Sequence, residues 1–482
     1  MRIVFAFILL VGSPYLCFSQ QCYQPLQETD KESGKEERQS AWPYFAHYSP
    51  AQKRLIKENW KQYFRSDIHQ SLAPGITMFP IKFDSYGGIY PDGDFFKEFK
   101  EQDFSPSRFN VKNPLAFSLY DMFDGGNEDL VKLAISSQHD SSANAFYLDQ
   151  LKRVKGSDEF TRTFEDFYTA WRKFHIPRKT DELKNVIRSG KKTKVLFFIH
   201  GFNVPYSLAV IQAIELHNLM EKEGVNTDPI LLVPVFWPSN DAKDCEIEND
   251  KTFSTRNETS VKNGTRSTHY SNRAYFAATS LRKIIYDLQS EPGIQVYMLS
   301  HSLGATVLTT TLINTYSKLQ VKRDVPAETI EEYMSVNEDR FDPLTKGLLW
   351  RLTDNNPIPA MPIRSFMSAA AIPGLGTFND MDESLMRHKK FYVGVNHDDE
   401  MLSKRFKIFK FLTIKLNPNK FSSTALGMDF LNDACDTQKK FTGELDGNFV
   451  VKEVSNKEDH DILIYMLQNE FRKLVVEFIA SK

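Results

Sequence analysis

A short segment at residues 300–304, Ser-His-Ser-Leu-Gly, follows directly on an apolar run at residues 294–299. The residues after it, to about 316, are compatible with a helix. A strand that turns sharply into a helix, with serine at the apex and a small residue two positions to either side, is typical of a nucleophile elbow. Small flanks let strand and helix pass close together around the strained apex. The spacing therefore predicts Ser302 as the nucleophile, with Ser300 standing where the usual pattern has its first glycine.

A second motif lies about a hundred residues upstream. The apolar run at residues 195–199 has the character of a strand buried on both faces of a parallel sheet, and it ends in His200-Gly201-Phe202-Asn203. Gly201 allows the backbone to turn at the carboxyl end of this strand, so that the next N–H points into the site. We expect the backbone N–H groups of Phe202 and Leu303 to form an oxyanion hole.

The other members of a catalytic triad are expected later in the chain, first an acid and then a histidine, each after a further strand. Runs at 363–371, 391–395 and 449–454 read as such strands. The loop after the second run contains the neighbouring carboxylates Asp398 and Asp399, which are candidates for the acid. The alternative is that this loop is a solvated turn before a helix. His460 is the only histidine after His397, and it lies in the loop after the last strand, where a general base belongs.

These motifs resemble the alpha/beta-hydrolase superfamily, and within it a bacterial branch of largely uncharacterised hydrolases whose strand-3 motif reads V-x-x-x-H-G-F-N. The segment Phe236-Trp237-Pro238-Ser239 is similar to the strand-4 ending of that branch. The resemblance covers residues 180–480. It implies an α/β fold with a mostly parallel central sheet flanked by helices, an N-terminal elaboration and lid-like insertions. It also implies a serine-hydrolase mechanism with Asp399 as the acid and Asp398 as the fallback, but no particular substrate.

The first nineteen residues have the pattern of a secretory signal peptide. Arg2 precedes a short apolar stretch, and small residues precede a cleavage site after Ser19 or Gln20. We therefore expect a secreted protein, periplasmic in a bacterium, with lipid attachment at Cys17 as a weaker alternative. No later segment approaches 18 uninterrupted apolar residues, so no spanning helix is expected. Cleavage would leave Cys22, Cys245 and Cys435, of which the last two could form a bridge.

Composition narrows the classes of partner. The chain carries 60 basic and 62 acidic side chains for a formal charge of -2, which predicts no nucleic-acid footprint. Its 482 residues are 41% hydrophobic and can fill a large core. Closely spaced cysteine or histidine ligands are lacking in the sequence, so we expect neither a metal nor a cofactor.

The sequence divides into three parts. After the signal at 1–19, residues 20–180 form an N-terminal elaboration, and residues 181–482 form the catalytic core. Runs at 76–83 and 86–90 are expected as the first, antiparallel strands of the sheet, joined by a glycine turn; an independent binding domain is the alternative. Residues 240–272 read as a surface loop. A basic amphipathic helix after Asp399 either packs on the core or touches anionic lipid.

The sequence therefore predicts a secreted serine hydrolase that cleaves a carboxylic ester or related acyl bond through an acyl-enzyme on Ser302. Its substrate would be a small-molecule or lipid-like acyl compound. The alternative is a non-catalytic binding or assembly protein that retains the fold.

Overall fold

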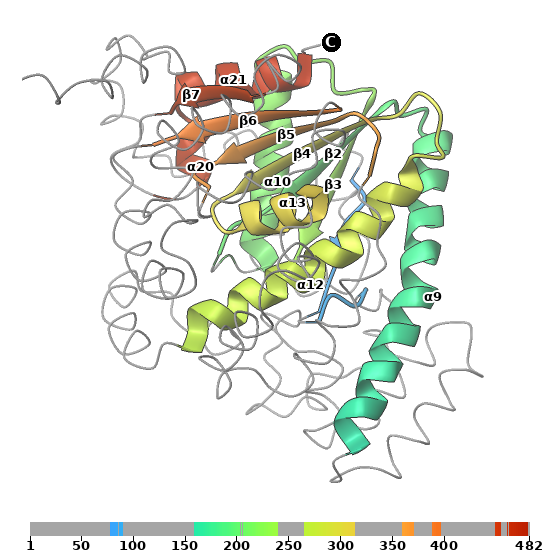
Figure 1. The fold of residues 1–482 in the computed structure, drawn as a ribbon. Helices are drawn as coiled ribbons and strands as arrows, with labels where there is room; N and C mark the ends of the chain where they lie inside the picture. The colour runs from blue at the N-terminus through green and yellow to red at the C-terminus, as the bar shows by residue number, and fades with distance from the viewer. Residues whose placement is uncertain are drawn as a thin grey trace, which may run out of the picture.

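The protein is described by a computed structural model, which covers residues 78–84, 86–89, 159–202, 204, 206–239, 265–313, 359–370, 388–396, 449–454, 460 and 462–480. Within these ranges the chain forms one sheet of seven strands in the order β1-β3-β2-β4-β5-β6-β7, all parallel (Figure 1). The strands are β1 (Ile81–Lys82), β2 (Lys194–Ile199), β3 (Ile230–Phe236), β4 (Gln295–His301), β5 (Ile363–Ser368), β6 (Lys389–Val395) and β7 (Phe449–Glu453).

Helices cover both faces of the sheet, as a parallel sheet requires. One face carries α9 (Glu159–Ser189), α12 (Thr265–Leu288) and α13 (Gly304–Ile313), which close the main apolar cluster over the strands (Figure 1). The other face carries α10 (Tyr206–Lys222), α20 (Ile462–Tyr465) and α21 (Asn469–Ala480). The mostly parallel α/β architecture expected from the sequence is confirmed.

The central strands form where the sequence has continuous apolar runs. Residues 195–199 of β2 and 230–236 of β3 are buried throughout. Such strands satisfy their backbone polar groups only by pairing on both sides, and β2 does so with β3 and β4. In this register Ile199 stands opposite Ser300, so the carboxyl ends of β2 and β4 lie level.

The strand order reverses between β2 and β4. From β2 the chain adds β3 on one side of the sheet and β4 on the other. At such a switch point the loops after the two strands diverge to opposite faces, and the crevice outside their carboxyl ends is where open α/β sheets bind ligands. The His200 and Ser302 motifs follow these two strands, so both meet at this crevice.

Two expectations for the earlier part of the chain are wrong. β1 pairs with β3 in parallel and not antiparallel, although an isolated antiparallel bridge joins Phe83 to Ile89 around the expected glycine turn. The loop expected at residues 240–272 is wrong for its last eight residues, because α12 begins at Thr265. α9 continues through residue 180, and the division into elaboration and core at that residue stays a prediction.

The end of the chain forms two helices and not one continuous helix. The first turn ends at Tyr465, and a new helix begins at Asn469, with Glu470 in its first turn. The amide of Leu467 donates to Ile464 O and that of Gln468 to Tyr465 O, which tightens the chain between the helices. The break lets α20 approach the end of β6 while α21 packs along β5 and β6.

Candidate active site

Ser302 sits at the apex of a strand-to-helix turn between β4 and α13. Its φ is 51°, in the left-handed region that non-glycine residues rarely adopt. The turn is held on both sides: the Ser302 amide donates to Ser368 O of β5 at 3.0 Å, and the Ala305 amide donates to Ser302 O at 3.0 Å. The side chain is 5% exposed. This is the backbone geometry of a nucleophile elbow, found at the residue that the sequence pattern indicates.

Two glycines allow the elbow to pack against the end of β2. A β-carbon on Gly304 would stand 2.5 Å from the carbonyl oxygen of His200 and 2.8 Å from that of Ile199. A β-carbon on Gly201 would stand 3.1 Å from Cβ of Ser302 and 2.8 Å from Nδ1 of His301. Only glycine fits such close approaches of backbone to backbone and side chain. The loop after β2 is thereby brought directly beside the nucleophile.

His460 contacts the nucleophile directly. Its Nε2 lies 2.6 Å from Oγ of Ser302, within hydrogen-bond reach for proton transfer. His460 is half-buried and lies between β7 and α20, as the sequence predicts. For Nε2 to accept the hydroxyl proton, the ring's own proton must reside on Nδ1. The structure thus brings together two residues that are 158 positions apart in the chain.

The predicted oxyanion-hole residues flank this pair. Leu303 follows Ser302 and directly precedes α13, so its N–H belongs to the unpaired amides at the start of a helix. Phe202 lies one residue beyond Gly201, and its half-buried side chain packs against the main apolar cluster. Both positions therefore lie next to Ser302, on the two loops that the glycines bring together.

His200 is a neutral structural histidine. Its Nε2 accepts a hydrogen bond from the Trp237 amide at 3.3 Å, and its Nδ1 donates to Gly201 O at 3.0 Å. The ring stacks on the Trp237 indole, with centroids 5.7 Å apart and planes at 12°, and the indole N–H donates to His200 O. Burial lowers the pKa of His200 to about 4, so both contacts are made by the uncharged ring.

Ser239 extends this network to the loop after Gly201. Its hydroxyl accepts from the amide of Val204 and donates to the carbonyl of the same residue, both at 3.2 Å, and lies 3.5 Å from Nδ1 of His200. The end of β3 is thereby connected to the β2 loop that carries Phe202. All three residues of this network, His200, Trp237 and Ser239, belong to the sequence motifs at the ends of these strands, but the pattern there indicates no role for them.

A second layer of side chains lies behind His460. The ring centroids of His301 and His460 are 4.9 Å apart, and those of His301 and Tyr465 are 5.9 Å apart. Asn396, directly after β6, donates from Nδ2 to the hydroxyl of Tyr465 at 2.9 Å. The roles of His301, Tyr465 and Asn396 were not predicted from the sequence. The one indication there was the position of His301 inside the Ser-His-Ser-Leu-Gly segment.

Other predicted residues lie outside the described ranges. They include the acid Asp399, its fallback Asp398, His397, the signal peptide, the amphipathic helix after Asp399 and all four cysteines. In the ranges that are described, no group of three or more His, Cys, Asp or Glu is placed to hold a metal ion. None of the helices there combines the length and apolar character that a membrane span requires.

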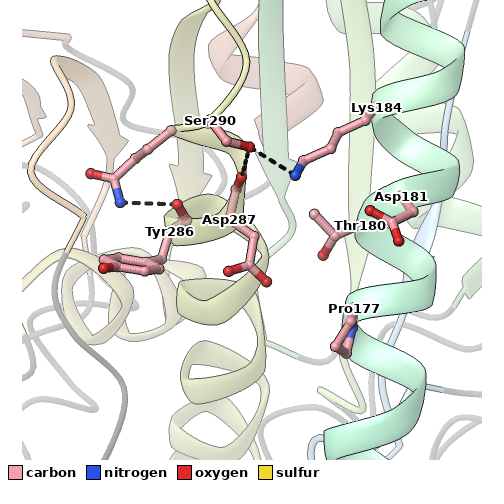
Figure 2. Close-up of a pocket in the computed structure, with 8 residues that line it drawn as sticks. Pro177, Thr180, Asp181, Lys184, Tyr286, Asp287 and Ser290 are labelled. Carbon is pink, nitrogen blue, oxygen red and sulfur yellow. Dashed lines mark hydrogen bonds between the residues drawn. The ribbon is translucent and has the colours of Figure 1, made fainter.

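A separate hollow of about 390 Å³ lies between α9 and α12 (Figure 2). Lys184 donates to Ser290 Oγ across it at 2.9 Å, which links the two helices. The hollow lies by the end of α12 that leads into the start of β4, whereas Ser302 follows the end of that strand. It therefore does not belong to the Ser302 site.

The parallel sheet, with the strand-to-helix elbow at its switch point, defines the class: the protein has the alpha/beta-hydrolase fold. Residues 177–339 match the sequence model of a family described as "Alpha/beta hydrolase of unknown function (DUF900)". That match covers about a third of the chain and includes β2, β3, β4 and the elbow. No curated protein and no solved structure matches the chain closely enough to count as a relative.

Proposed function

We propose that this protein is a serine hydrolase that cleaves a carboxylic ester or a related acyl bond through an acyl-enzyme on Ser302. The observation that carries the proposal is the 2.6 Å contact between His460 Nε2 and Ser302 Oγ at a residue with φ of 51°. A serine with an adjacent base on a strained turn is the arrangement that activates a hydroxyl for acyl transfer.

The reaction follows from this geometry. Ser302 Oγ attacks the acyl carbon while His460 Nε2 takes the hydroxyl proton. The N–H groups of Phe202 and Leu303 stabilise the resulting oxyanion, which collapses as the bond to the leaving group breaks and His460 protonates that group. Water then attacks the acyl-enzyme and gives a proton to His460 Nε2. The bond to Ser302 Oγ breaks, the proton returns to this oxygen, and the acid product leaves.

We assign Asp399 as the acid that orients His460. It lies three residues after Asn396, whose side chain contacts Tyr465 on the helix that follows His460. A carboxylate in this loop would hold the Nδ1 proton of His460 and stabilise the imidazolium that forms in the reaction. The signal-like pattern at residues 1–19 supports an extracytoplasmic site for this activity.

The proposal is tested with a fluorophosphonate, which reacts with activated serines. We expect covalent labelling of the wild type on the peptide containing Ser302, and none in Ser302→Ala. Ser300→Ala is the matched control, because it removes a buried serine hydroxyl two residues away that has no hydrogen-bond partner within the described ranges. A folded wild type that stays unlabelled would reject the hydrolase and favour a binding protein that retains the fold.

A further inference from the structure

We propose that the hydrogen bond between Asn396 and Tyr465 holds the segment that follows His460 at the end of β6, so that both residues are positioning residues for His460. This inference rests on the proposed function. Asn396 directly follows β6 and precedes the loop of Asp399, whereas Tyr465 ends α20, five residues after His460. The Asn396 Nδ2 donates to the Tyr465 hydroxyl at 2.9 Å.

This contact lies just beyond the end of the strand pairing. The β6–β7 ladder finishes at Val395 and Glu453, followed by one bond from the Val454 amide to Val395 O. In the sequence Asp399 follows the first of these segments and His460 follows the second. Within the described ranges, the Asn396–Tyr465 bond is the next hydrogen bond that joins them.

The bond is protected from water, which makes it a firm constraint. Asn396 and Tyr465 are each 1% exposed, and a buried amide or hydroxyl that loses its partner is costly to leave unpaired. The Tyr465 ring is also held by neighbours, with centroids 6.3 Å from Phe471 and 5.9 Å from His301. His301 in turn contacts the His460 ring at 4.9 Å. Asn396 is thus connected to the base through packed side chains.

Loss of the bond should affect the chemical step and not substrate binding. Both side chains are buried behind His460, so a substrate does not reach them. A displacement on the order of 1 Å in a catalytic group can cost about 100-fold in rate. We expect removal of the Tyr465 hydroxyl to slow the reaction of Ser302 by roughly 10-fold, because the ring and its packing remain.

The experiment measures the rate of fluorophosphonate labelling of Ser302, together with kcat and KM for a short-chain ester, in the wild type and in Tyr465→Phe. The variant should react about 10-fold more slowly with the probe, and its kcat should fall by a similar factor. Its KM should stay within about two-fold of the wild-type value, because Tyr465 is buried and a substrate does not touch it.

Tyr297→Phe is the matched control. Tyr297 is also 1% exposed and donates its hydroxyl to Gln295, but at the far end of β4. The same chemical change there should leave the labelling rate and kcat within about two-fold. A wild-type labelling rate in Tyr465→Phe would overturn the inference, while an unlabelled wild type would instead reject the proposed function.

A double-mutant cycle tests whether one bond carries the effect. Asn396→Ala removes the other partner of the bond. Thermal unfolding shows whether Tyr465→Phe folds, and if it does not, Asn396→Ala takes its place as the test. If the two residues act through their mutual bond, the double variant should react about as slowly as the slower single variant. A double variant whose labelling rate falls by the product of the two single reductions would contradict the inference.

Discussion

The carbonyl oxygen of His200 lies 2.5 Å from the position that a β-carbon on Gly304 would take. The end of β2 and the start of α13 therefore approach each other through backbone atoms. Because the obstacles are backbone carbonyls at the end of β2, neither side can yield without moving the elbow.

Gly304→Ala should thus both destabilise the fold and impair the site. Overpacking of this kind costs about 1–3 kcal/mol, and displacement of Ser302 should slow its labelling at least about 100-fold. Gly224→Ala is the control, since Gly224 has φ of 77° but open space around its Cα. It should cost about 1 kcal/mol and leave labelling unchanged. Urea unfolding and labelling rates give both quantities; equal behaviour of the two variants would contradict the close-packing argument.

Ser302 and His460 should behave as one unit. Ser302→Ala, His460→Ala and the double variant should all show similarly low turnover of a short-chain ester, each reduced on the order of 10³-fold or more. Circular dichroism should show the fold intact. Near-wild-type turnover in His460→Ala would exclude it as the base and direct attention to His397.

The acid is identified by substituting two neighbours in the same way. Asp399→Asn keeps the side-chain shape but disfavours the His460 tautomer with its proton on Nδ1, so kcat should fall far more than KM rises. Asp398→Asn should have a modest effect. The opposite pattern would move the acid by one residue, and small effects in both would place it elsewhere in the chain.

Stability should depend on pH through His200. The pKa of this histidine falls from 6.5 to about 4 on folding, so below about pH 6.5 the unfolded chain binds a proton that the folded chain does not. The contribution of neutral His200 to the free energy of unfolding is complete above pH 6.5. It is lost as the pH falls toward 4, by up to about 3 kcal/mol. His200→Gln cannot bind this proton, and its unfolding free energy should fall less steeply over that range. Parallel curves for the two proteins would contradict a neutral buried His200.

The predictable parts of the fold are those set by local pattern. Buried parallel strands appear as continuous apolar runs, and the elbow requires small residues at fixed spacing, so β2, β3, β4 and Ser302 could be placed from sequence. His460 could be placed because chain order left one candidate in the last loop.

Features set by long-range contacts could not be predicted. The direction of a two-residue strand such as β1 depends on the path of the chain and not on its residues. Residues 265–272 are rich in Ser, Thr and Asn, yet they are helical because the rest of α12 is fixed in the core and a formed helix propagates readily. The Asn396–Tyr465 bond joins residues 69 positions apart and has no local signature.

The left-handed backbone at Ser302 sets the stability of the fold against the presence of the hydroxyl. A residue with a β-carbon at φ of 51° costs about 1–2 kcal/mol that glycine would avoid. Ser302→Gly should therefore raise the free energy of unfolding while it removes the hydroxyl. The backbone of this turn and the chemistry proposed for it thus favour different residues at the same position.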